Sequence, residues 1–202
     1  MTRDQDRLQQ VRLLLTLEGI MEHRAERQLR KEVRQLATLV EQSTSPSVML
    51  LSNVNDLVET FRPTWVKLLA QHYAITGRAF SARIFARLVK QEKKAFRDTF
   101  TSAMGRFISK WGLEKARQIT RTTRDFVRQL IVDGVGEGLG TREIARTIRD
   151  QLTGIGRLNP KQRSEVIART ETHSAAGFAN RESLRAVDLP GVQREWLAVE
   201  DA

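Results

Sequence analysis

The 202-residue sequence contains no cysteine, only four prolines and few aromatic residues, which make up 6% of the chain. The absence of cysteine excludes disulfide bonds, zinc fingers and thiol catalysis. The longest apolar run, around Leu13–Leu17, is far shorter than the roughly 20 residues that span a membrane. The first ten residues, MTRDQDRLQQ, lack the basic start and apolar stretch of a signal peptide. These absences predict an unexported protein, made in a reducing cytoplasm, without membrane contact.

Recognisable catalytic and metal-binding patterns are also missing. The chain has no G-x-S-x-G or H-E-x-x-H motif, and it has three histidines, His23, His72 and His173. Glu171 and His173 are two residues apart on a predicted helix, so their side chains point in different directions and cannot hold one ion. We interpret the histidines as solvent-facing or capping residues. We predict no enzymatic activity, catalytic residue, metal site or cofactor.

The formal net charge of +10 is concentrated in one quarter of the chain. Residues 77–129 hold 14 basic and 4 acidic side chains, whereas the segments on either side are close to neutral. A polyanion, or an acidic face of a protein, is the kind of partner that such a segment attracts.

Helical periodicity covers almost the whole chain. Residues 1–42 form an amphipathic arm, with Leu29, Val33, Leu36 and Val40 on one stripe. We expect a loop at 43–47, a helix that begins at Pro63 and stops at Gly77, and a further helix over 80–111. After Trp111 and Gly112 a second basic-faced helix is predicted.

These last two helices each combine a basic stripe with an apolar back. The residues of the two stripes are Arg83, Arg87, Lys90, Lys94 and Arg97, then Arg117, Arg121, Arg124 and Arg128. They are read either as solvated faces or as a surface that meets DNA phosphates or an acidic partner. The aromatic residues lie on the apolar side, so base stacking is not supported, and only backbone contact without sequence reading is expected.

Glycines divide the rest of the chain. The run GVGEGLG at 134–140 has neither dinucleotide-binding nor P-loop spacing, and it is read as a helix stop, a turn and a restart with Thr141 as N-cap. Asn159 and Pro160 predict the start of one continuous helix that reaches about Ala186. Alternation over 192–199 predicts a strand, and because a single strand needs neighbours, we expect the sheet to continue in sequence beyond residue 202.

The C-terminal part resembles the phage Mu F-like head-morphogenesis family of minor capsid proteins. The resemblance covers roughly residues 110–202 and rests on GLGTREIARTIRDQL, on IARTE within RSEVIARTETHSAAGFANRESLRA, and on REWLAVEDA. It implies a small α+β domain, a helix followed by a sheet that is incomplete in this chain. The residues that match the family pattern are Arg169, Thr170, Glu171, Asn180 and Trp196, which the resemblance marks as structural. A carboxylate at Glu171 would then pair with an arginine or with strand N–H groups and set the register between helix and strand.

The expected fold is therefore mainly α, with an elongated helical N-terminal region that leads into that α+β domain. The expected divisions are 1–42 (arm), 43–133 (basic-faced helices), 134–159 (glycine-rich loop and linker helix) and 160–202 (start of the α+β domain).

The resemblance implies a virion protein, present in multiple copies inside the head near the portal and in the host cytoplasm during assembly. Its implied partners are the portal protein, a capsid or scaffold protein and, through phosphate contacts, double-stranded DNA. Two alternatives stay open: a nonspecific DNA-binding protein that is packaged and ejected with the genome, and the delivery module of a phage-derived effector.

Overall fold

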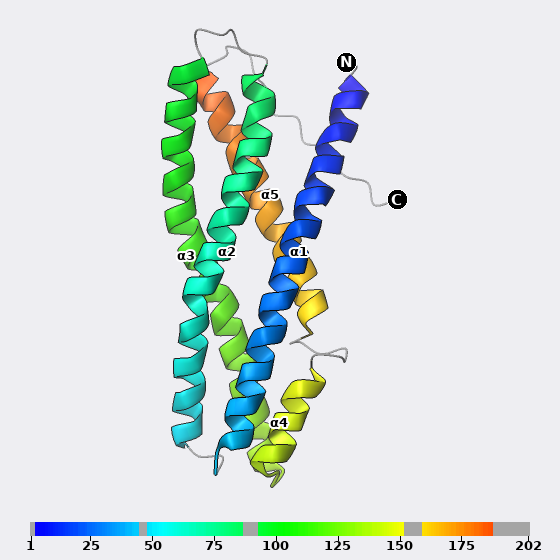
Figure 1. Cartoon of the computed structure of the whole chain (residues 1–202), viewed down its shortest axis with the longest axis vertical. Helices are drawn as coiled ribbons and strands as arrows, with labels where there is room; N and C mark the ends of the chain where they lie inside the picture. Colours follow the sequence, from blue (N-terminus) through cyan, green and yellow to red (C-terminus); the bar gives the residue numbers. More distant parts are fainter. Residues whose placement is uncertain (1–2, 45–47, 87–92, 152–158, 188–202) are drawn as a thin grey trace.

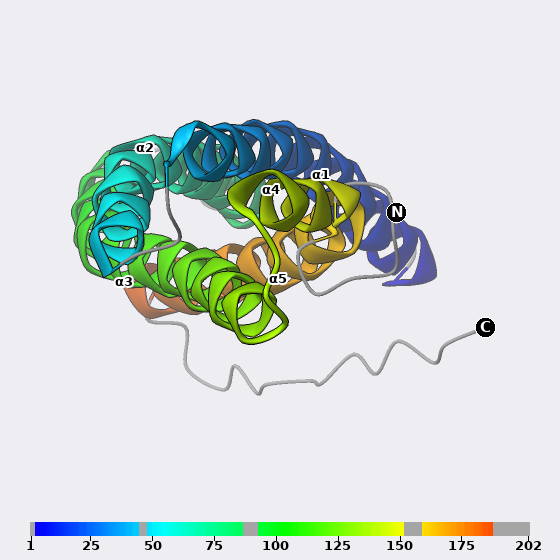
Figure 2. The ribbon, with the colours of Figure 1, turned by 90° about the horizontal axis from the view of Figure 1, so that it is seen from below.

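The computed structural model describes residues 3–44, 48–86, 93–151 and 159–187. Its helices are α1 (Arg3–Gln42), α2 (Val48–Phe85), α3 (Lys93–Gly136), α4 (Thr141–Asp150) and α5 (Pro160–Val187). The three long helices α1, α2 and α3 run up and down the molecule, and α5 returns beside them as the fourth member of an elongated bundle (Figure 1). The short helix α4 covers the end of the bundle where α1 and α3 finish, as the view from below shows (Figure 2).

Helix α5 packs against α1, α2 and α3 through small side chains. Its buried residues are Ser164, Ala168, Glu171, Thr172, Ala175, Ala176, Ala179 and Ser183. Small side chains at a spacing of three and four allow neighbouring backbones to approach closely. The core that they face contains the fully buried rings of Trp65 and Tyr73 from α2.

The predicted α+β domain is wrong. All regular structure in the described residues is helical, and α5, its expected first element, is a bundle helix whose neighbours are helices. The predicted strand over 192–199 lies outside the described residues. The error arises because an Ala-rich helix packs against three helices with the same sequence pattern that it would need to pack against a sheet. The sequence of α5 therefore does not distinguish the two arrangements.

Three predicted helix boundaries in the middle of the chain are also wrong. Pro63 and Gly77 lie inside α2, and Trp111 and Gly112 lie inside α3. Pro63 removes one backbone donor, but it sits on the exposed side of α2, where water can hydrate the carbonyl left without a partner.

The helix expected over 80–111 is instead divided between α2 and α3. Phe85 and Phe100 meet edge-on with ring centroids 5.7 Å apart, so the apolar backs of the two segments pack against each other.

The glycine-rich segment behaves as a stop and restart. Helix α3 ends at Gly136, Gly138 takes a positive φ of 75°, and α4 begins at Thr141. The N-cap is Gly140, one residue earlier than predicted, and its N–H donates to the Glu143 carboxylate at 2.8 Å. The predicted start of α5 is confirmed, because Asn159 Oδ1 accepts from the N–H groups of Lys161 and Gln162 at 2.9 and 3.2 Å.

Gly134 is required by the close packing of α4 on α3. A Cβ atom at this position would lie 2.7 Å from Cγ1 of Ile144, which is buried. We expect Gly134→Ala to lower the free energy of unfolding by about 1–3 kcal/mol because the two helices must separate. Gly136→Ala, where a Cβ meets nothing within 4 Å, is the control. Chemical denaturation measures both, and equal stability of the two variants would contradict the prediction.

Candidate functional site

The first predicted basic stripe includes a tether between helices. Arg83 of α2 donates to the Asp6 carboxylate at 2.9 Å and to Gln9 Oε1 at 3.2 Å, both on α1, and is half-buried there. Arg87 and Lys90 lie outside the described residues, and the side chains of Lys94 and Arg97 lie outside them too. Arg83 therefore holds the N-terminal half of α1 against the bundle.

The second stripe runs along α3 and is largely engaged within the chain. Arg121 and Arg124 both lie near the Asp125 carboxylate, at 3.8 and 2.9 Å. Arg128 donates to Asn55 Oδ1 of α2 at 3.1 Å. Arg117 is exposed. The stripe is therefore a partly neutralised face and not a continuous row of exposed cations.

We expect Arg83→Gln to lower the free energy of unfolding by about 1 kcal/mol, because a half-buried, hydrogen-bonded ion pair is lost. Affinity for duplex DNA at a fixed salt concentration should stay unchanged, since the guanidinium already faces Asp6. Denaturation and a DNA-binding titration test the two parts. Loss of DNA affinity without loss of stability would assign Arg83 to a DNA interface instead.

The centre of the bundle contains a polar cluster around Glu171. The Tyr73 hydroxyl of α2 donates to Glu171 Oε2, and the indole of Trp111 on α3 lies close enough to favour the charged form of this carboxylate. Burial raises the pKa of Glu171, while these donors and the positive charge of Lys115 oppose the rise. Glu171 thus joins α5 to α2, and within the part of the chain that the structure describes it pairs with neither an arginine nor a strand.

At the neighbouring positions of the same two helices, His72 of α2 is buried beside two threonines. Its Nε2 lies 2.8 Å from Thr172 Oγ1 on α5 and 3.5 Å from Thr76 Oγ1. Burial, together with the charge of Arg24 on α1, lowers the pKa of His72 to about 4. The prediction that His72 is solvent-facing or capping is wrong, because its ring is 1% exposed in the middle of α2.

A second polar cluster surrounds Glu32 of α1. Its Oε1 accepts from the Trp65 indole at 2.6 Å and from Gln28 at 2.8 Å, and Oε2 accepts no hydrogen bond from any described residue. Burial raises the pKa of Glu32 to about 7, against the opposing charge of Arg163 on α5. Arg163 itself donates to Thr123 Oγ1 on α3 at 3.1 Å.

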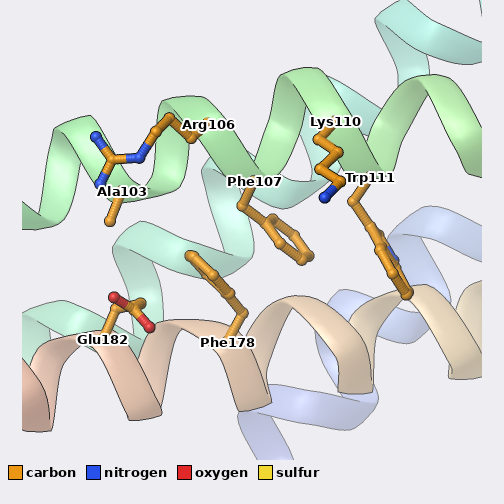
Figure 3. A pocket seen from close by; sticks show the side chains of 7 residues that line it. All are labelled: Ala103, Arg106, Phe107, Lys110, Trp111, Phe178 and Glu182. Atoms are coloured by element: carbon orange, nitrogen blue, oxygen red, sulfur yellow. The ribbon is translucent and has the colours of Figure 1, made fainter.

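Two shallow hollows lie on the outer seam where α3 and α5 run antiparallel. The first has a volume of about 270 Å³ and a floor of Phe107, Trp111 and Phe178, with Ala103, Arg106, Lys110 and Glu182 around it (Figure 3). The second, about 320 Å³, is lined by Gln118, Ile119, Thr122, Gln162, Arg163, Val166 and Ile167. Both volumes fall near or below the lower end of small-molecule sites, about 300–1,000 Å³, so they suit single side chains better than a cofactor.

The remaining residues of the family pattern do not gather at one place. Arg169 and Thr170 are exposed, Asn180 is half-buried, and Trp196 lies outside the described residues. Among the described residues, no three His, Asp or Glu side chains come close enough to share a metal ion. None of the described helices combines the length and the apolar character that crossing a membrane requires.

The sequence contains a signal for these polar clusters that the predictions did not use. Glu32 lies on the same stripe of α1 as the apolar residues Leu29, Val33 and Leu36. His72 likewise follows Trp65 and Leu69 at helical spacing. A polar residue on an apolar stripe predicts a buried, hydrogen-bonded group.

Comparisons with protein-family models, with curated proteins and with solved structures give no match to this chain.

Proposed function

We propose that this protein is a minor capsid, head-morphogenesis protein of a tailed bacteriophage that acts structurally at or near the portal during procapsid assembly. The observation that carries the proposal is the placement of Glu171, the acidic residue of the IARTE run. Its carboxylate is buried and accepts a hydrogen bond from Tyr73 of α2, so it joins α5 to α2. Two of the three segments that carry the family resemblance form α4 and most of α5, and the third, over 194–202, lies outside the described residues.

A structural role also fits the polar side chains of the interior. His72 contacts Thr172 across the α2–α5 interface, and Glu32 contacts Trp65 across the α1–α2 interface. Both polar residues are buried and do not line an open cleft. Groups arranged in this way fix which helices meet and in which register.

The alternative of a nonspecific DNA-binding protein receives less support. Arg83 pairs with Asp6, and Arg121 and Arg124 share Asp125, so two carboxylates reduce the positive charge that could displace counterions from a duplex. Arg128 keeps its charge unpaired by a carboxylate but is held by the Asn55 amide of α2.

The test is co-sedimentation of the protein with procapsids assembled with and without their portal. We expect the protein to sediment with the shells only when the portal is present. Glu165→Ala, which removes an exposed carboxylate on the same helix as Glu171, is the control for a substitution in α5. Its co-sedimentation with both kinds of shell should match that of the wild type. Equal incorporation in both kinds of shell, or none in either, would contradict the proposal.

A further inference from the structure

The seam between α3 and α5 exposes a large apolar side chain at each of its two hollows. Trp111 is 38% exposed and Val166 is 67% exposed, and they lie at the two hollows described above. Both helices are otherwise firmly packed on α2 and α1, so the seam is a fixed part of the surface. A continuous apolar surface with a polar rim is typical of a protein–protein contact.

The spacing of the hollows has the dimensions of a helix-binding groove. Phe107 and Ile119 on α3 are 12 residues apart, and Phe178 and Ile167 on α5 are 11 residues apart. At 1.5 Å per residue, these separations place the hollows about 16–18 Å from each other. A partner helix would reach both with two apolar side chains about 11 residues apart, since three turns bring them to the same face.

The charges at the first hollow define the chemistry of that partner. Arg106 and Lys110 line it and form no ion pair with any described residue, while Lys115 lies 5.0 Å from the Trp111 ring and Arg181 lies 5.6 Å from the Phe178 ring. The single acidic lining residue, Glu182, already lies 2.9 Å from Arg185. The second hollow has a mainly apolar and amide lining.

We propose that the α3–α5 seam binds an amphipathic helix of a partner protein, with two apolar anchors in the hollows and acidic residues around the anchor at Trp111. Charge complementarity at Arg106 and Lys110 sets the direction of the bound helix, because the second hollow offers no such cluster of cations. Single-stranded nucleic acid fits less well, since Phe107 and Phe178 already stack on each other with centroids 4.2 Å apart, and the second hollow has no aromatic residue.

The test uses fluorescence anisotropy and a stapled, fluorescein-labelled helical peptide. The peptide has two leucines about 11 residues apart, with glutamates flanking one of them. A second peptide has lysine in place of every glutamate, and a third has both leucines replaced by glutamine. We expect the acidic two-leucine peptide to bind at least tenfold more tightly than either of the others.

Matched variants of the full chain then locate the binding. Lys110→Glu and Val166→Glu should each weaken binding of the acidic peptide at least tenfold. Lys67→Glu, an exposed lysine on α2, and Val132→Glu, an exposed valine near the far end of α3, should leave it unchanged. Circular dichroism establishes that all four variants are folded.

Three results would overturn the proposal. The first is equal affinity for the three peptides, or equal effects of the four variants. The second is tighter binding of a labelled oligothymidine that Lys110→Glu abolishes and Val166→Glu spares, which would assign the seam to nucleic acid. The third is self-association in analytical ultracentrifugation that Val166→Glu removes, which would assign it to a second copy. Because the probe is a peptide, failure here and failure of the portal experiment are separate outcomes.

Discussion

Replacement of Glu171 with alanine should lower the free energy of unfolding by about 2–4 kcal/mol. The change leaves the Tyr73 hydroxyl without its acceptor, and a buried unsatisfied donor costs about 1–3 kcal/mol. It also leaves a cavity where the buried Glu171 side chain packed, which adds to the cost. The cost is concentrated at the point where α5 meets both α2 and α3, so the whole bundle should unfold at lower denaturant concentration.

Two comparisons separate this effect from a general sensitivity of α5. Glu165→Ala, on the exposed side of the same helix, should change stability by no more than about 0.5 kcal/mol. A double-mutant cycle of Glu171→Ala with Tyr73→Phe should give a coupling energy of about 1–3 kcal/mol. Additive effects of the two substitutions would show that the hydrogen bond contributes nothing to stability.

The second large effect concerns pH, where two buried groups act in opposite directions. The pKa of Glu32 is raised to about 7, so the folded state holds a proton that the unfolded state has lost, and stability falls as pH rises from about 4.5 to about 7. The pKa of His72 is lowered to about 4, so the unfolded state takes up a proton first, and stability falls as pH drops from about 6.5 to about 4. Each contribution amounts to about 3 kcal/mol over its range, and the two nearly cancel between pH 4.5 and 6.5.

Single substitutions should therefore reveal slopes that the wild type conceals. Relative to the wild type, Glu32→Gln should become less stable by about 3 kcal/mol as pH falls from 7 to 4.5, and His72→Gln should become more stable by a similar amount as pH falls from 6.5 to 4. Urea denaturation at several pH values measures the differences, and curves parallel to that of the wild type would rule out these titrations.

Periodicity predicted the helical character of the chain well, and local chemistry predicted some of its boundaries. Asn159 and Pro160 start α5 as expected, because an N-cap and a proline at the first helical position act through neighbouring backbone groups. Pro63 does not begin a helix and Gly77 does not end one, because tertiary packing of α2 outweighs the local cost of either residue. No glycine or proline marks the end of α2 at Phe85. At this end of the helix, Phe85 contacts Phe100 of α3, a residue that lies 15 positions further along the chain.

The candidate sites were harder to predict, for an equally physical reason. The sequence shows that Arg83 and Arg128 share faces with other cations, but their partners, Asp6 and Asn55, are more than 70 residues away. The groove at Trp111 and Phe178 likewise exists only where α3 and α5 meet. For Arg121 and Arg124, the interpretation of the stripes as solvated faces was therefore nearer to the structure, in which both residues lie near Asp125.

The order in which the helices pack has a consequence for synthesis of the protein. Helices α2 and α3 are adjacent along the chain and can form a hairpin early, whereas α1 finds its largest contact in α5, which is made last. Closing so long a segment costs conformational entropy before any contact is gained, which slows folding. Before α5 is synthesised, the apolar stripe of Leu29, Val33 and Leu36 on α1 is only partly covered. During this time the nascent chain exposes an apolar helix face that is prone to aggregation. Packing of the Ala-rich surface of α5 on α1 therefore buries this apolar face and ends the exposure of the nascent chain to aggregation.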